Sequence, residues 1–138
     1  MTAATVSERD FRNVHGAFGA KTAFLISSAL LGVASQRLVR RICPECKGTG
    51  RQADDPSKRC RNCRGTGYKG RIAIFELMII NDDLRHAINQ HEDTTVLTNI
   101  AKKHGMRTLK EDGDLKVKLQ LTTESEVTRV CKLDIASD

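Results

Sequence analysis

The chain has 138 residues, 39% of them hydrophobic and 4% aromatic, with a formal net charge of +6. That length suits one modest domain or two very small ones, whose core must be built from Leu, Ile, Val and Ala. Five cysteines, four of them in two Cys-x-x-Cys pairs, argue against a disulfide scaffold and indicate a metal site in a reducing compartment.

The N-terminal segment, residues 1–20, has no periodic apolar pattern and is predicted to be a flexible lead-in. The uncharged run over residues 22–36 is too short, and too rich in Ser and Gly, to span a bilayer. Acidic Glu8 and Asp10 precede that run, which argues against a signal peptide. A cytoplasmic location is therefore expected.

Residues 22–42 are predicted to form a helix. Ile26, Leu30 and Val33 fall in one apolar row at helical spacing. Arginines gather in the last turns of the segment, where cations suit the negative end of a helix dipole. Pro44 then prevents the helix from continuing.

Residues 43–67 are predicted to form a metal-binding loop. Two tight Cys-x-x-Cys turns can direct four thiolates at one ion, and Zn²⁺ prefers a tetrahedral set of soft sulfur ligands: Cys43, Cys46, Cys60 and Cys63. Each pair precedes a Gly-Thr-Gly sequence, whose glycines allow backbone N–H groups to turn toward the sulfurs. Four protein ligands leave no site for water, so the metal is predicted to be structural. The alternatives are an iron–sulfur cluster and a redox Cys-x-x-Cys pair.

Basic residues gather at positions 37–41, just before this loop, and at positions 58–64, within it. Such bunches could meet nucleic acid, an anionic membrane surface or an acidic partner, or could form a solvated rim. No aromatic platform accompanies them, which argues against single-stranded nucleic acid.

Residues 70–80 are predicted to form a strand, because β-branched and aromatic residues fill the run between Gly70 and Asn81. A helix capped by Asn81 or Asp82 should follow. A second helix, capped by Asp93 or Thr94, should then end at a glycine, Gly105.

The last part of the chain is also predicted to be helical. Residues 106–119 suit a helix that Gly113 weakens. Thr123 and Glu126 have the spacing of a capping box before a final apolar helix. Residues 132–138 are predicted to form a frayed tail.

No catalytic residue is predicted. His86, His91 and His104 lie in helical surface patterns and should be solvated or half-buried, and Cys131 is interpreted as an ordinary apolar residue. Residues 16–22 resemble a phosphate-binding loop, but that motif needs glycines where this chain has His15 and Ala20. No nucleotide-binding residue is predicted either.

Four stretches of this sequence, at residues 30–44, 60–77, 105–113 and 122–130, are similar to one protein family. The second contains Cys-x-x-Cys-x-Gly-Thr-Gly-Tyr-Lys-Gly-Arg. The chain resembles the C-terminal zinc-binding region of the type II secretion ATPases (the E component) and type IV pilus assembly ATPases, over roughly residues 21–131. It departs from the family at Gln120, where a Gly is usual, so the sequence leaves open whether a left-handed helix cap forms there. It also departs at Ser125, where an acidic residue is usual.

The resemblance implies an α+β fold: a C-terminal fragment of a RecA-like P-loop ATPase domain with an inserted four-cysteine zinc subdomain and a small C-terminal helical bundle. It implies that residues 21–42 are the last core helix of the RecA-like domain, 43–70 the zinc subdomain and 71–131 a strand plus the bundle. The family consists of hexameric cytoplasmic ATPases at the bacterial inner membrane. Their Walker A, Walker B and histidine-box motifs do not occur in this sequence, so ATP binding belongs to the full-length family and no hydrolysis is expected from this chain alone.

The leading hypothesis is a structural and coupling module. Zinc held by the four cysteines would stiffen a projection that links ATPase motion to the inner-membrane platform protein, in protein secretion or pilus biogenesis. The resemblance also implies a hexamer for the full-length family, and no nucleic acid as partner. The alternatives are a DnaJ-like chaperone zinc module, which also uses CxxCxGxG repeats, and a nucleic-acid-binding zinc ribbon.

Overall fold

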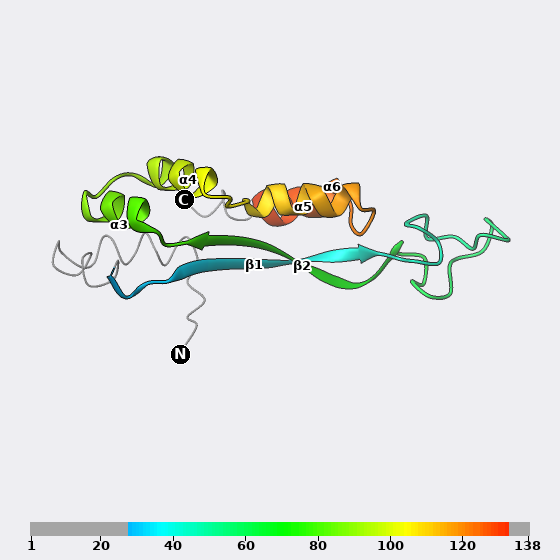
Figure 1. Ribbon diagram of the computed structural model, residues 1–138. Coiled ribbons are helices and arrows are strands. Elements are labelled where there is room, and N and C mark those ends of the chain that lie inside the picture. The colour runs from blue at the N-terminus through cyan, green and yellow to red at the C-terminus, as the bar shows by residue number, and fades with distance from the viewer. Residues whose placement is uncertain (1–27, 133–138) are drawn as a thin grey trace. The chain divides into compact units, whose positions relative to one another are not determined.

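A computed structural model describes residues 28–132, which form two strands and four helices (Figure 1). The predicted lead-in at 1–20, the start of the predicted helix up to residue 27, and the tail beyond residue 132 lie outside the described residues. The described chain divides into two compact units. The first contains residues 28–35 and 75–108, and the second contains residues 36–74 and 109–132.

The strands β1 (Gly32–Ile42) and β2 (Tyr68–Ile79) pair as a two-stranded sheet. The Ile80 N–H donates to the Leu31 carbonyl at 3.0 Å, and the Cys43 N–H donates to the Gly67 carbonyl at 2.9 Å. The start of one strand therefore meets the end of the other, which makes the pair antiparallel. The strand predicted at 70–80 is confirmed.

The helix predicted over residues 22–42 is wrong from residue 32 onward, where the chain is a strand. The apolar spacing of this segment is compatible with a helix, but its backbone groups are paired with β2 instead. Burial follows a period of two near Ser35 and Val39, which are buried, whereas Gln36 and Leu38 between them are exposed. A partner strand distant in sequence has overridden the local pattern.

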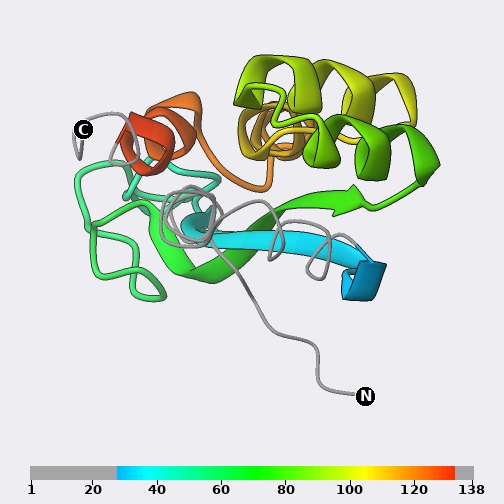
Figure 2. The ribbon, with the colours of Figure 1, turned by 90° about the vertical axis from the view of Figure 1, so that its left-hand side faces the viewer.

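In the first unit, α3 (Asp82–Asn89) and α4 (Thr94–Lys103) pack together (Figures 1 and 2). They enclose a cluster of buried apolar residues: Ile80, Leu84, Ala87, Ile88, Leu97 and Ala101. Both predicted caps are confirmed, because Asn81 accepts from an N–H of α3 and Asp93 from an N–H of α4, each at 2.9 Å. Gly105 follows α4 with a φ of +91°, as the sequence predicted.

In the second unit, α5 (Leu109–Lys118) and α6 (Glu124–Lys132) pack as a pair. Gly113, which the sequence suggested would weaken a helix, lies at their contact. A Cβ atom at this position would be 2.5 Å from Val127 Cγ1, so the glycine permits the close approach of the two helices. Gln120 adopts a φ of +56°, so a left-handed cap forms after α5 without the usual glycine.

The structure is α+β, as predicted. The domain boundaries predicted from the sequence cut across the two units, because α3 and α4 belong to the first and α5 and α6 to the second. Within the described range, none of the helices combines the length and the apolar character that crossing a bilayer requires.

Candidate metal centre

The four predicted cysteines come together in the loop between β1 and β2. Their sulfur atoms all lie within 4.8 Å of one another. Cys43 Sγ is 3.9 Å from Cys60 Sγ, and Cys46 Sγ is 3.6 Å from Cys63 Sγ. Sulfurs around a tetrahedral zinc ion, with bonds of about 2.3 Å, lie about 3.8 Å apart, whereas a disulfide needs about 2.05 Å. The spacing fits one tetrahedral ion and excludes disulfides in this arrangement.

Each cysteine pair ends in a turn that aims a backbone donor at a sulfur. The Gly50 N–H donates to Cys46 Sγ at 3.3 Å, and the Gly67 N–H donates to Cys63 Sγ at the same distance of 3.3 Å. These bonds confirm the prediction that the glycines turn N–H groups toward the sulfurs. Such donors stabilise thiolates and fix their orientation. We call the two turns, residues 43–50 and 60–67, the knuckles.

Two backbone hydrogen bonds, one in each direction, join the two knuckles. The Cys43 N–H donates to the Gly67 carbonyl at 2.9 Å, and the Cys60 N–H donates to the Gly50 carbonyl at 2.8 Å. A Cβ atom at Gly50 would lie 2.4 Å from the Gly65 carbonyl oxygen, and Gly67 is equally close to the opposite knuckle. The repeated sequence therefore produces two matching turns that fit together only with glycine at these positions.

This loop has almost nothing else in its interior. Among residues 43–67, the buried ones are the four cysteines and two glycines: Cys43, Cys46, Cys60, Cys63, Gly50 and Gly67. This stretch of the sequence has no aromatic side chain and no aliphatic one larger than those of alanine and proline. The sulfur cluster is therefore the whole core of the loop.

The pKa values of Cys60 and Cys63 are shifted in opposite directions. Backbone N–H donation from Cys63 favours the Cys60 thiolate, but burial and the neighbouring sulfurs outweigh it and raise the pKa of Cys60 to about 11. Burial also opposes ionisation of Cys63, yet bonds from the Gly67 N–H and from the Cys46 and Cys60 thiols lower the pKa of Cys63 to about 6. A divalent cation bound at the cluster would favour the thiolate form of Cys60 at neutral pH.

A second polar cluster lies at the base of the loop, and sequence analysis missed it. The buried Glu126 carboxylate accepts from the Arg40 N–H at 3.0 Å, from Arg40 Nη2 at 2.7 Å and from Arg129 Nη2 at 3.0 Å. The bonds from Arg40 and then Arg129 lower the pKa of Glu126 to about 2. The capping-box signal found only half of this arrangement: the Glu126 N–H donates to Thr123 Oγ1 at 3.4 Å.

Further contacts fasten the same region to the residues just before Cys43. The Tyr68 ring lies 4.2 Å from the Arg40 guanidinium, and the Tyr68 hydroxyl is 2.9 Å from Thr123 Oγ1. Thr122 Oγ1 donates to the Arg40 carbonyl at 2.8 Å. Polar bonds therefore join β1 and the start of α6 next to Cys43, the first cysteine of the cluster.

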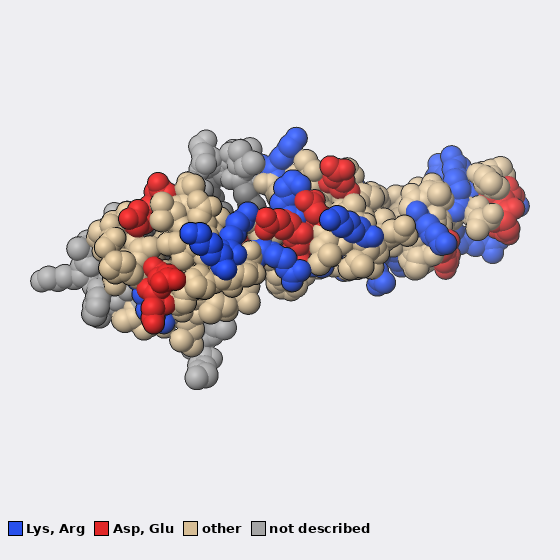
Figure 3. Space-filling view, turned by 45° about the horizontal axis from the view of Figure 1, so that its top comes forward, with Lys and Arg blue, Asp and Glu red and all other residues tan. Residues whose placement is uncertain are grey.

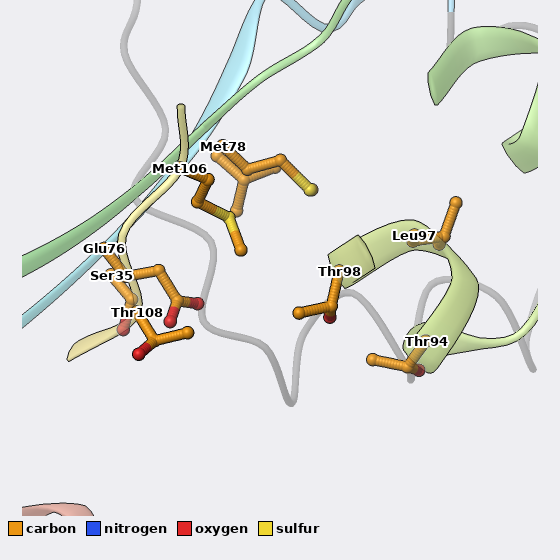
Figure 4. A pocket seen from close by; sticks show the side chains of 9 residues that line it. Ser35, Glu76, Met78, Thr94, Leu97, Thr98, Met106 and Thr108 are labelled. Atoms are coloured by element: carbon orange, nitrogen blue, oxygen red, sulfur yellow. The ribbon is translucent and has the colours of Figure 1, made fainter. Parts of the chain in front are cut away.

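The remaining candidate residues stay apart from the cluster. His86, His91 and His104 are exposed, as predicted, and His104 Nε2 lies 2.9 Å from Asp83 Oδ2. The first unit contains a separate pocket of about 200 Å³, lined by methionine, leucine, valine and small hydroxyl side chains with Glu76 (Figure 4). No histidine or cysteine lines it, so its lining offers no nucleophile–imidazole pair.

The family model described as "Type II/IV secretion system protein" matches residues 17–129. The chain is 42% identical over 122 residues to the type IV pilus assembly ATPase PilB of Thermus thermophilus, covering 75% of this chain and 14% of that protein. It is 40% identical over 126 residues to the type II secretion system protein E of Pectobacterium carotovorum, covering 79% of this chain and 24% of that protein. The chain thus spans a quarter or less of the length of these curated relatives.

Two solved structures share the fold. The pilus retraction motor PilT with bound ADP matches with a TM-score of 0.59 and 17% identity, over 93% of this chain and 30% of PilT. The Legionella pneumophila ATPase DotB matches with a TM-score of 0.54 and 16% identity, over 97% of this chain and 30% of DotB. These comparisons confirm the resemblance found in the sequence and favour it over the chaperone and zinc-ribbon alternatives.

Proposed function

Because the chain belongs to the type II/IV secretion system protein family, we propose that it is the zinc-binding portion of a secretion or pilus-assembly ATPase. The ligands in this proposal are Cys43, Cys46, Cys60 and Cys63, which hold one Zn²⁺. The loop they close is a structural and coupling module between ATPase motion and the inner-membrane platform protein. The observation that carries the proposal is the convergence of four buried sulfurs within 4.8 Å in a loop with no other core.

The donor set supports a structural zinc ion. Four soft thiolates match the preference of Zn²⁺, and they fill a tetrahedral sphere, which leaves no ligand position for a reacting water. When bound, the ion supplies positive charge and folding free energy of order 10 kcal/mol. The N–H groups of Gly50 and Gly67 would orient two of the sulfurs, and the reciprocal backbone bonds would hold the two pairs at one distance.

The anchoring at the base of the loop supports a coupling role. A segment that passes motion to a partner must be stiff both in itself and where it joins the rest of the protein. Glu126 provides the second condition by binding the backbone and side chain of Arg40, three residues before Cys43. ATP binding in the full-length protein, a hexameric assembly and a cytoplasmic position against the inner membrane complete this proposal.

Elemental analysis of the purified chain tests the metal part. We expect one zinc per chain, loss of that zinc and of loop structure on chelation, and recovery when Zn²⁺ is returned. Cys60→Ser should lose the metal, whereas the matched variant Cys131→Ser, outside the cluster, should keep it. Absence of stoichiometric metal, or an unchanged circular dichroism spectrum and thermal midpoint after chelation, would contradict the proposal. Visible absorption by the purified protein would indicate an iron–sulfur cluster instead.

Binding to the detergent-solubilised platform protein tests the coupling part. We expect the zinc-loaded chain to bind, the chelated chain to lose binding, and re-addition of zinc to restore it. Equal binding by the zinc-loaded and chelated forms would show that the metal loop is not the contact.

A further inference from the structure

The positive charge of the chain is concentrated around the metal loop. Residues 36–74 contain eleven Lys and Arg against three Asp and Glu, a formal charge of +8, whereas the whole chain carries +6. Four thiolates and one Zn²⁺ would lower the charge of the segment by two, which leaves it strongly cationic. Figure 3 shows these Lys and Arg side chains in blue over the loop on the right, with acidic side chains among them.

Most of these cations have no acidic partner among residues 28–132, which the structure describes. Two ion pairs of this segment join Arg40 to Glu126 and Lys58 to Asp55. Eight other basic side chains are exposed and have no ion pair within the part of the chain that the structure describes: Arg41, Lys47, Arg51, Arg59, Arg61, Arg64, Lys69 and Arg71. Unpaired charge at this density favours an anionic partner.

Two of these cations, Arg51 and Arg61, line one pocket of about 310 Å³ beside Cys60. The backbone that carries them is well fixed. The Arg51 N–H donates to Thr49 Oγ1 at 3.2 Å, and Arg51 also forms an isolated antiparallel bridge with Arg59. Arg61 directly follows a metal-binding cysteine. Arg51, directly after the first knuckle, and Arg61, within the second, therefore line one hollow that is large enough for a side chain of a partner.

We propose that this pocket, which we call the Arg51/Arg61 pocket, binds an acidic segment of a protein partner. A carboxylate of that segment would be held by the planar N–H forks of the two arginines, which suit bidentate bonds to carboxylates. The inference rests on the proposed function, because the metal holds the walls of the pocket, and it names the chemistry by which the module recognises its partner.

The composition of the pocket favours a polypeptide over other anions. Glu45 and Asp54 line the same hollow. A lipid surface or a phosphate backbone would bring negative charge against these carboxylates, whereas a polypeptide can place a basic or amide group opposite them. Residues 43–67 also contain no large apolar side chain to enter a bilayer and no aromatic ring to stack on a base.

The test uses the zinc-loaded full chain and a fluorescein-labelled peptide of alternating Glu and Gln, whose amide side chains can face Glu45 and Asp54. Arg51→Gln/Arg61→Gln removes both arginines of the pocket, and the matched variant Lys69→Gln/Arg71→Gln removes two exposed charges from the same basic segment outside it. We expect the peptide affinity to fall about tenfold or more in the first variant and less than about threefold in the second. Metal content is measured on every sample.

The outcomes separate this inference from the proposed function. Equal losses in the two double variants would overturn it, because the effect would then be net charge alone. Tighter binding to phosphatidylglycerol vesicles or to oligothymidine than to the peptide, at the same salt concentration, would overturn it as well. A chain without zinc contradicts the proposed function, whereas a zinc-loaded chain that does not prefer the acidic peptide contradicts only this inference.

Discussion

The metal loop of the second unit and the helix pair of the first unit are stabilised by different chemistry. The helices α3 and α4 bury six apolar residues, including Leu84 and Leu97, so hydrophobic burial can hold them together. The metal loop buries only cysteines and glycines. A loop without an aliphatic core cannot be held by hydrophobic burial, so its order should depend on its ligand. The same chain thus contains one region with an apolar core and one whose order, under the proposed function, depends on a metal.

Metal removal should produce the largest difference in stability between the metal loop and the helix pair. Chelation, or Cys60→Ser, removes binding free energy of order 10 kcal/mol that is coupled to folding of the loop. Hydrogen exchange should show loss of protection at Cys60, Gly50 and Gly67, whose N–H groups are bonded within the knuckles. The amides of α3 and α4 should keep their protection. Comparable loss in both regions would refute the contrast, and Cys131→Ser provides the control that retains the metal.

Gly50→Ala should have the next largest effect on the stability of the second unit. Its Cβ atom would lie 2.4 Å from the Gly65 carbonyl oxygen, and its φ of +72° is unfavourable for alanine. We expect a loss of about 3 kcal/mol in the free energy of unfolding of the second unit, measured by urea titration at fixed free zinc.

Gly70→Ala is the matched control for that substitution. Gly70 has nearly the same φ, +75°, but nothing lies within 4 Å of a Cβ atom placed there. It should cost about 1 kcal/mol, from backbone conformation alone. Equal effects of the two alanines would show that the knuckles do not require close contact.

Replacing Glu126 with Gln should weaken the base of the loop without removing the metal. Gln keeps the shape of the side chain but loses the charge that accepts bonds from Arg40 and Arg129. Because both arginines are about half exposed, we expect a loss of about 2 kcal/mol at neutral pH, less than for a fully buried pair. Glu124→Gln, exposed at the start of the same helix, should cost less than about 0.5 kcal/mol.

The pH dependence of that difference provides an independent check. The folded-state pKa of Glu126 is lowered from 4.5 to about 2, so its contribution is fully present above pH 4.5 and is lost as the pH falls through about 2. Acid release of the metal affects wild type and variant alike and cancels in the difference. The gap in unfolding free energy between wild type and Glu126→Gln should therefore close between these two pH values. A gap that stays constant would assign the effect to packing.

Local features of this molecule could be predicted from the sequence, and contacts between distant residues could not. The cysteine pairs, the caps at Asn81 and Asp93 and the strand near residues 70–80 all depend on neighbours a few positions away. The strand β1 depends on a partner that begins at Tyr68, beyond the whole metal loop. Its apolar residues also fit helical spacing, so nothing local distinguished the two outcomes.

The cluster around Glu126 was hidden for the same reason. Arg40 and Glu126 are 86 positions apart, and neither belongs to a pattern that requires the other. The capping-box spacing was a correct local signal, but it assigned the carboxylate to its own helix. The arginines at positions 37–41 were assigned to a helix terminus, whereas one of them binds α6 through both its backbone and its side chain.

Gln120→Gly should change stability least among these substitutions, and it should be the one that increases it. Gln120 has a φ of +56°, and the two N–H groups that close α5 donate to the Val117 and Lys116 carbonyls at 2.9 and 3.0 Å. Left-handed backbone costs a residue with a side chain about 1 kcal/mol, and the larger entropy of glycine in the unfolded chain offsets part of the gain. We expect Gln120→Gly to stabilise the second unit by about 0.5 kcal/mol, as a rise in its thermal midpoint.

Gln90→Gly shows whether that gain comes from the left-handed conformation. Gln90 also ends a helix, α3, but with an ordinary φ of −83°, so glycine there should cost stability through the unfolded chain and through loss of the hydrogen bond between Gln90 Nε2 and His86 Nε2 at 2.8 Å. The two substitutions should therefore have opposite signs. The residue after Gln120 connects this cap to the metal loop, because the Leu121 carbonyl accepts the Ile42 N–H at 2.9 Å, one position before Cys43. A tighter cap should accordingly slow hydrogen exchange at Ile42 even where zinc is already bound.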